Sequence, residues 1–245
     1  MDNGVRIIPF FIDINAQLTL RFCGIAFPRR FHEDRRPTSR AFMIGYGANE
    51  FTGLRVEMEI TLMRHGQPTI TRFRGSEKIK AAEMHAWIAG YDASDVTGHP
   101  PQEAKSVCDE RDFILSSPLQ RARSSLFELD AHPDLILDNL REAPLPLVAL
   151  PWLKLSPHTW LIVFRLFWFL GLSHGLESRS AVQQRAKQAT CDLIAAAKQR
   201  DRIFSMGHGL MNRLISRELE RQGWKKTQGE GSGYWGWVTY VSPAD

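Results

Sequence analysis

The pattern of apolar and polar positions changes character near residue 58. In residues 1–57, short apolar pieces alternate with prolines, glycines and arginines, and no helical or strand period is sustained. From residue 58 onward, short apolar runs alternate with segments that carry an apolar face at helical spacing. We therefore predict a folded domain over 58–245. For 1–57 we predict a poorly ordered extension or a mis-assigned start, with Met58 as initiator and a small β-rich appendage as the alternative.

Strand-like and helix-like segments follow one another through the folded part. The apolar runs predict strands at 58–63, 112–117, 135–140, 202–207 and 234–241. The periodic segments predict helices at 76–91, with Ser76 as its N-cap, and at 100–109, 118–129, 177–200 and 209–222. This alternation predicts an α/β sandwich around a mostly parallel sheet.

A strongly apolar insertion near 151–172 does not fit that alternation. Four aromatic side chains fall on one helical face, namely Trp160, Phe164, Phe167 and Trp168. The run 160–172 is too short to cross a bilayer, which takes roughly 20 apolar residues, and Arg165 interrupts it. We interpret the insertion as a buried core helix or as a homodimer contact through 158–172. A hydrophobic lid over a bulky or apolar ligand is a further hypothesis.

Composition narrows the classes of partner. The net charge of +4 and the pI of about 9.1 are mildly basic, and the charges are scattered, so we expect no nucleic-acid partner. The sequence holds 3 cysteines without a CxxC pair, which indicates reduced thiols in the cytoplasm. No segment has the form of a signal peptide or of a membrane span.

Basic and imidazole side chains follow the predicted strands where each strand ends. The first strand ends in Arg64-His65-Gly66, the second leads through SSPLQ to Arg121, and another ends in SMG before His208. The segment LILDNL leads to Arg141 and Glu142. In open α/β sheets ligands bind outside the carboxyl ends of the strands, so we expect these residues to converge on one rim.

Such a set of groups suits phosphoryl transfer. Guanidinium groups and imidazoles can surround a tetrahedral dianion with donors, and a planar guanidinium matches two phosphate oxygens. A neutral imidazole can act as the nucleophile, and a carboxylic acid can protonate the leaving oxygen. Because side chains supply the positive charge, we expect no metal and no cofactor, and the sequence has no DxD, HExxH or P-loop pattern.

The motifs LMRHG, SSPLQRARS, REAPLP, GLES and SMGHG, in that order over about residues 58–241, resemble those of the histidine phosphatase superfamily, which includes the phosphoglycerate mutases. The resemblance implies a three-layer α/β/α fold around a mostly parallel mixed sheet and a phosphohistidine intermediate without a metal cofactor. It implies that His65 is the nucleophile and that Glu142 is the proton donor. It also implies a phosphate pocket completed by Arg64, Arg121 and His208.

Some of these roles have competitors in the sequence. Glu142 could instead pair with Arg141, and Asp138 and Glu177 are rival acids. For Glu177, in GLES, we favour a plain charge at a helix N-terminus. Arg72 and Arg74 are either contacts to the substrate beyond its phosphate or surface charges.

The insertion and the residues after RHG bear on the reaction. A mutase acting on a small carboxylated phosphate would carry a polar, basic lid and an Asn after RHG. The insertion is instead strongly apolar, and the segment GQPTITRFRG contains no Asn. We therefore predict a histidine acid phosphatase-like phosphomonoesterase that acts on a small phosphorylated substrate. The alternatives are a phosphoglycerate mutase-type phosphotransferase, a protein phosphohistidine phosphatase, and a non-catalytic module that binds a phosphorylated ligand on the same fold.

Overall fold

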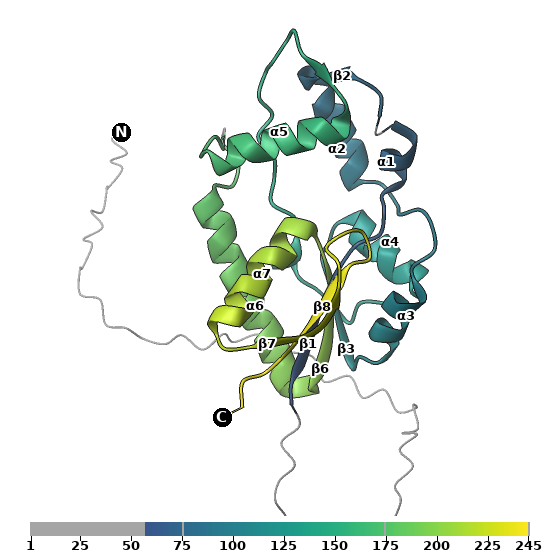
Figure 1. The fold of residues 1–245 in the computed structure, drawn as a ribbon, viewed down its shortest axis with the longest axis vertical. Helices are drawn as coiled ribbons and strands as arrows, with labels where there is room; N and C mark the ends of the chain where they lie inside the picture. The colour runs from purple at the N-terminus through teal and green to yellow at the C-terminus, as the bar shows by residue number, and fades with distance from the viewer. Residues whose placement is uncertain (1–56, 75, 174, 245) are drawn as a thin grey trace, which may run out of the picture. The chain divides into compact units, whose positions relative to one another are not determined.

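The computed structural model describes residues 57–74, 76–173 and 175–244 (Figure 1). Our predictions for residues 1–56 lie outside the described part of the chain. Within that part, none of the helices combines the length and the apolar character needed to cross a membrane.

The centre of the molecule is a 6-stranded mixed sheet with the strand order β4-β3-β6-β1-β8-β7. The parallel part comprises β1 (Glu59–Arg64), β3 (Phe113–Ser116), β4 (Leu135–Ile136) and β6 (Arg202–Gly207). β8 (Trp237–Val241) pairs with β1 in the antiparallel sense, and β7 (Lys225–Glu230) pairs with β8 in the same way. The predicted mostly parallel α/β fold is thus confirmed.

Helices cover both faces of this sheet, as Figure 1 shows. α3 (Gln102–Asp109) and α4 (Gln120–Glu128) lie on one side, and α6 (Arg179–Arg200) and α7 (Gly209–Arg221) lie on the other. The core beneath α3 and α4 joins side chains of β1 and β6 to helical ones; among its fully buried members are Met63, Ala122, Leu126, Phe204 and Met206. Because side chains of a strand alternate between faces, the neighbouring residues Ile60, Leu62 and Ile203 serve the opposite core.

A second, smaller core lies beyond the carboxyl end of β1 (Figure 1). We call this part the cap; it comprises β2 (Ile79–Lys80), the 3-10 turn Ala81–Glu83, α2 (Met84–Asp92), β5 (Lys154–Leu155) and α5 (Pro157–Phe169). The indole of Trp160 donates to the carbonyl of Ile79 at 2.8 Å and ties its two halves together. The helical insertion expected near 151–172 is therefore confirmed, and it forms one half of the cap.

The residues of α5 divide among three surroundings. Trp160, Phe164 and Trp168 are buried, as expected of a core helix, while Phe167 is partly buried. Ile162, Leu166 and Phe169 are 51%, 57% and 43% exposed. This exposed apolar strip is compatible with the homodimer contact through 158–172, which stays a prediction.

Several predicted element bounds were wrong. The expected helix at 76–91 begins as β2 and a 3-10 turn, and α2 starts only at Met84, so Ser76 caps nothing. The strand expected at 135–140 ends at Ile136 and continues as the 3-10 turn Asp138–Leu140. α1 (Thr69–Arg74) and β7 carry largely polar sequences, TITRFR and KKTQGE, and were therefore not predicted from apolar periodicity.

Candidate active site

His65 stands directly after β1 and is only 2% exposed. Its Nδ1 lies 2.7 Å from the carbonyl oxygen of Gly66, an acceptor, so Nδ1 carries the proton and donates it. Its Nε2 is consequently unprotonated and accepts a hydrogen bond of 3.3 Å from Nε of Arg121. The backbone of His65 also donates to Gly207, the last residue of β6, at 3.1 Å. The imidazole is thus fixed in one tautomer, with its free electron pair facing a guanidinium.

Gly66 allows the chain to turn away from the strand at this point. A Cβ on Gly66 would lie 2.3 Å from Cζ2 of Trp235, a distance that real Cβ atoms do not show. The Gly66 N–H donates to the hydroxyl of Ser125 at 2.8 Å, and that hydroxyl donates to the carbonyl of Arg121 at 2.6 Å. The turn that orients His65 is therefore tied to α4, the helix that carries Arg121.

Arg121 lies in the first turn of α4 and is 2% exposed. Besides its bond to His65, it donates through a terminal nitrogen to Oδ1 of Asp92 at 2.6 Å. Its guanidinium lies over the ring of Tyr91, 4.6 Å from the centroid. Asp92 and Tyr91 come from α2, so one residue of α4 connects the sheet edge to the cap.

Arg64 is the last residue of β1, next to His65. A terminal nitrogen of its guanidinium donates to the carbonyl of Ser232 at 3.0 Å, and the guanidinium lies over Tyr234 at 4.6 Å. Its Nε is buried without a hydrogen-bond partner among the described residues. The guanidinium packs against Gly209 at the start of α7, where a Cβ would lie 3.5 Å from the guanidinium carbon, an ordinary van der Waals contact.

His208 is the N-cap residue of α7 and is fully buried. Its ring centroid lies 5.1 Å from that of His65. Its Nε2 lies 2.7 Å from the hydroxyl of Ser117, whereas its Nδ1 is buried with no partner in the described part of the chain. The two imidazoles, from the ends of neighbouring parallel strands, therefore lie side by side.

Burial dominates the electrostatics of both histidines. Loss of solvent lowers the pKa of His65 well below its usual value, and the positive charges of Arg121 and then Arg64 lower it further. Burial likewise lowers the pKa of His208, followed by the same Arg121 charge. Both imidazoles are thus neutral at physiological pH, which is the state a nucleophilic imidazole requires.

Glu142 reaches the same region from the loop after the 3-10 turn Asp138–Leu140. Its carboxylate accepts hydrogen bonds from the backbone N–H of Leu210 at 3.1 Å and of Met211 at 3.3 Å. It also accepts one from the N–H of Ala143 at 3.0 Å. The carboxylate therefore contacts the N-terminal turn of α7, whose donors lie two and three residues after His208, and the helix dipole favours an anion at this end.

The other carboxylates weighed from the sequence have partners elsewhere. Arg141 pairs with Asp138 at 2.9 Å, so the suggested pairing of Arg141 with Glu142 was wrong. Glu177 accepts two hydrogen bonds from Arg185, both of 2.8 Å, and Arg185 lowers the pKa of Glu177. Glu177 thus stabilises the start of α6 through an ion pair with Arg185 in its second turn, a role beyond that of a plain charge at the helix N-terminus.

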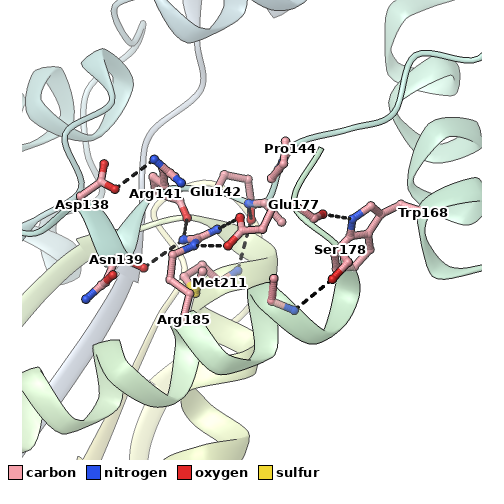
Figure 2. A network of polar contacts seen from close by, with 12 residues as sticks. Asp138, Asn139, Arg141, Glu142, Pro144, Trp168, Glu177, Ser178, Arg185 and Met211 are labelled. Atoms are coloured by element: carbon pink, nitrogen blue, oxygen red, sulfur yellow. Dashed lines mark hydrogen bonds and ion pairs between the residues drawn. The ribbon is translucent and has the colours of Figure 1, made fainter. Parts of the chain in front are cut away.

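Arg185 also holds the segment that carries Glu142, as Figure 2 shows. One of its terminal nitrogens donates to the carbonyl of Asn139 at 3.0 Å and to that of Arg141 at 2.6 Å. The carbonyl of Glu177 in turn accepts a 3.0 Å bond from the indole of Trp168 in α5. One side chain of α6 therefore links the loop before Glu142 to the end of the cap.

A cavity of about 460 Å³ opens beside Arg121 and Glu142. Its walls come from α2, the start of α4, the loop after Glu142, α5 and the segment before α6. Arg72 and Arg74 are exposed and do not line this cavity. No group of three or more His, Cys, Asp or Glu side chains that could hold a metal occurs in the ranges that the structure describes.

Sequence reasoning missed several residues of this region. Asp92, Tyr91 and Tyr234 contact the arginines, Ser117 contacts His208, and Arg185 organises the loop before Glu142. Ser117 follows β3 directly and could have been found by the same strand-end argument as His65. The others lie in helices or in the loop before β8, and no local pattern marks them.

Comparison with known proteins gives likenesses of structure only. No protein-family model matches the chain, and no curated protein matches it. A mycobacterial glucosyl-3-phosphoglycerate phosphatase solved with VO3 is 19% identical, with a TM-score of 0.48 over 74% of this chain and 90% of that one. A phosphoserine phosphatase from Entamoeba histolytica, solved with 3-phosphoglyceric acid, is 17% identical, with a TM-score of 0.43 over 74% of this chain and 89% of its own.

A putative alpha-ribazole-5'-P phosphatase from Escherichia coli is also 17% identical, with a TM-score of 0.43 over 65% of this chain and 79% of that one. All three neighbours are described as phosphatases.

Proposed function

We propose that the protein is a metal-independent, histidine acid phosphatase-like phosphomonoesterase that works through a phosphohistidine intermediate on His65. The observation that carries this proposal is the state of the His65 ring. Its Nδ1–H is held by the Gly66 carbonyl at 2.7 Å, and its unprotonated Nε2 faces Arg121 at 3.3 Å. A neutral, oriented nitrogen nucleophile beside a fixed cation is the arrangement that attack on an anionic phosphoryl group needs.

The surrounding donors support the same proposal. Arg64 and Arg121 supply two guanidinium groups, and His208 adds an imidazole 5.1 Å from His65 between ring centroids. Buried polar atoms are nearly always hydrogen-bonded, yet Arg64 Nε and His208 Nδ1 have no partner among the described residues. The equatorial oxygens of a phosphate would accept hydrogen bonds from these donors and from Arg121. Stabilising the charge on these oxygens is the main source of catalysis in phosphoryl transfer.

The reaction then has two displacements. Nε2 of His65 attacks phosphorus as the bond to the alcohol oxygen breaks, and protonated Glu142 donates its proton to the departing alkoxide. Water next attacks the phosphorus of phospho-His65, the Glu142 carboxylate accepts the proton, and inorganic phosphate leaves as the N–P bond breaks. The Glu142 carboxylate accepts hydrogen bonds from Leu210 and Met211, just after His208 in the chain, which supports its role as the proton donor.

Part of the proposal concerns the surroundings of the enzyme. The sparse cysteines of the sequence support a reducing compartment, and we propose a cytoplasmic location on that ground. The exposed residues of α5 support the homodimer contact named above.

The test uses His65→Ala and an aryl phosphate such as 4-nitrophenyl phosphate. We expect wild type to release phosphate in the presence of a chelator, and the variant to lose turnover. Acid-quenched wild type should carry an acid-labile phosphoryl group on His65. His85→Ala, at an exposed position of α2, is the matched control and should keep full activity. Retained turnover in His65→Ala would dispose of the mechanism, and transfer of phosphate to a second acceptor rather than to water would indicate a mutase.

A further inference from the structure

Arg165 of α5 has an unusual position for an arginine. It is half-buried, and its terminal nitrogens donate to the carbonyls of Ala143 at 3.0 Å and Pro144 at 3.4 Å. These carbonyls directly follow Glu142 in the chain. Among the described residues no carboxylate oxygen lies within 4.0 Å of its guanidinium, although its burial lowers its pKa and so carries a cost.

Arg165 also lines the cavity beside Glu142, and it differs there from the other charged residues of the wall. Each other charged residue that lines the cavity is engaged: Asp92 with Arg121, Arg141 with Asp138, Glu177 with Arg185, and Glu142 with backbone N–H groups. Arg165 is thus the lining cation without a carboxylate partner in the described ranges. Most of the remaining wall is apolar, including Ile88, Leu119, Leu145, Leu161 and Leu176.

The cavity is placed to receive the alcohol half of a phosphomonoester. It is bounded on one side by Arg121, which contacts the candidate nucleophile, and on another by Glu142, the candidate proton donor. A phosphoryl group near His65 would therefore direct its leaving group into this space. Arg165 donates to the carbonyls of the two residues that follow Glu142, so a group held by Arg165 lies close to the candidate acid.

We propose that this cavity is the leaving-group site and that Arg165 binds an anionic group, a carboxylate, on an otherwise largely apolar alcohol. The proposal rests on the phosphatase function above and names its substrate class. A guanidinium that gives up water on burial recovers that loss most fully from a planar carboxylate, to which it can donate two parallel hydrogen bonds. The apolar walls accept the body of the alcohol and contribute by removing its surface from water.

The experiment compares matched substrates. We would measure kcat/KM for 4-carboxyphenyl and 3-carboxyphenyl phosphate against the corresponding carbamoylphenyl phosphates, which have the same shape without the charge. Wild type should prefer a carboxylate ester by about 10- to 100-fold, the size of one charge-assisted hydrogen bond. Arg165→Met should remove this preference, so that the carboxylate and amide esters are hydrolysed with equal kcat/KM.

The control is Arg179→Met, the same change at an exposed arginine that begins α6, lies over the ring of Phe169 and does not line the cavity. It should keep the preference, which separates a contact from an effect of net charge. Arg165→Lys keeps the charge but loses the planar fork, and it should show a reduced preference even if the Met variant does not fold. A preference as large as that of wild type in either folded Arg165 variant would overturn the proposal.

The wild-type result also separates this inference from the proposed function. Hydrolysis of both ester types at equal rates at both ring positions would overturn the role of Arg165 and leave the phosphatase standing. Hydrolysis of neither, with no phosphoenzyme, would instead count against the phosphatase.

Discussion

Nε of Arg121 lies 3.3 Å from Nε2 of His65, so a guanidinium and the candidate nucleophile share a hydrogen bond even though they stand 56 positions apart in the chain. The same guanidinium is held by Asp92 and lies over Tyr91. Lysine has no planar fork and cannot keep these three contacts at once. We expect Arg121→Lys to lower kcat for 4-nitrophenyl phosphate by roughly 100-fold, the size of one lost transition-state donor.

Arg123 provides the control for that experiment, since it lies on the exposed side of the same helix. Arg123→Lys should leave kcat unchanged. An equal loss in both variants, measured on protein with wild-type circular dichroism, would mean that the effect comes from α4 and not from the phosphate site.

Glu142 should matter in proportion to the difficulty of the leaving group. We expect Glu142→Gln to lower kcat for an alkyl phosphate by about 100- to 10,000-fold, because protonation of a poor leaving oxygen is lost. For 2,4-dinitrophenyl phosphate, whose leaving group departs without a proton, formation of the phosphoenzyme should change little, as a stopped-flow burst would report. The exposed Glu110→Gln is the control. Equal losses for both leaving groups would contradict the role of general acid.

The close approach of Trp235 to Gly66 predicts a structural sensitivity. A Cβ at Gly66 would lie 2.3 Å from the indole of a buried tryptophan, so Gly66→Ala must displace the ring or the backbone that orients His65. We expect a loss of about 1–3 kcal/mol in the free energy of unfolding, the usual cost of overpacking, with a lower kcat. Gly233→Ala, where a new Cβ meets nothing within 4 Å, should be neutral in denaturant titrations. Equal stability of the two variants would show that the contact yields easily.

The buried histidines predict how stability depends on pH. Burial holds the folded-state pKa of His65 and of His208 well below 6.5, so the unfolded chain binds more protons as the solution is acidified. The contribution of the neutral rings is therefore complete above about pH 6.5 and is lost as pH falls toward the folded-state pKa values. We expect Tm to fall from pH 7 to pH 5 less steeply in His65→Gln than in wild type. The exposed His85→Gln should follow wild type, and superimposable curves for all three proteins would count against this assignment.

The ion pair of Arg185 with Glu177 predicts coupled losses. The two side chains are only 9% and 18% exposed, so removing one partner leaves a poorly solvated charge and costs roughly 3 kcal/mol. Arg185→Met should also lower kcat for the alkyl phosphate more than for the dinitrophenyl ester, since Arg185 holds the loop before Glu142. In a double-mutant cycle with Glu177→Gln, the losses should be less than additive. Additive losses would mean that the pair does not act as a unit.

Periodicity predicted the central part of the fold well. The strand at 202–207 matches β6 residue for residue, and the helices at 100–109 and 209–222 agree with α3 and α7 to within two residues. These segments bury one face or both, so their sequences carry a strong period. Elements that bury little surface were not predicted. β7 is a polar edge strand that is held by its pairing with β8, and no apolar pattern indicates it.

The residues of the candidate site likewise divide into those that the sequence predicted and those that it did not. The strand-end argument named Arg64, His65 and His208, because the carboxyl ends of parallel strands meet at one edge whatever the intervening chain does. Tyr91, Asp92 and Arg165 come from the cap, whose position over that edge depends on how α2 and α5 pack together through contacts such as Trp160 with Ile79. Such packing cannot be predicted from the local sequence.

By itself, then, the sequence determined the α/β framework and the groups at its rim, because burial imposes a period on strands and helices and because strand polarity fixes where their ends meet. Only the tertiary structure decided the tautomer of His65, the place of Glu142 at the first turn of α7, and the cation that faces the leaving-group cavity. Each of these depends on distances between residues far apart in the chain, and such distances follow from the packing of whole elements.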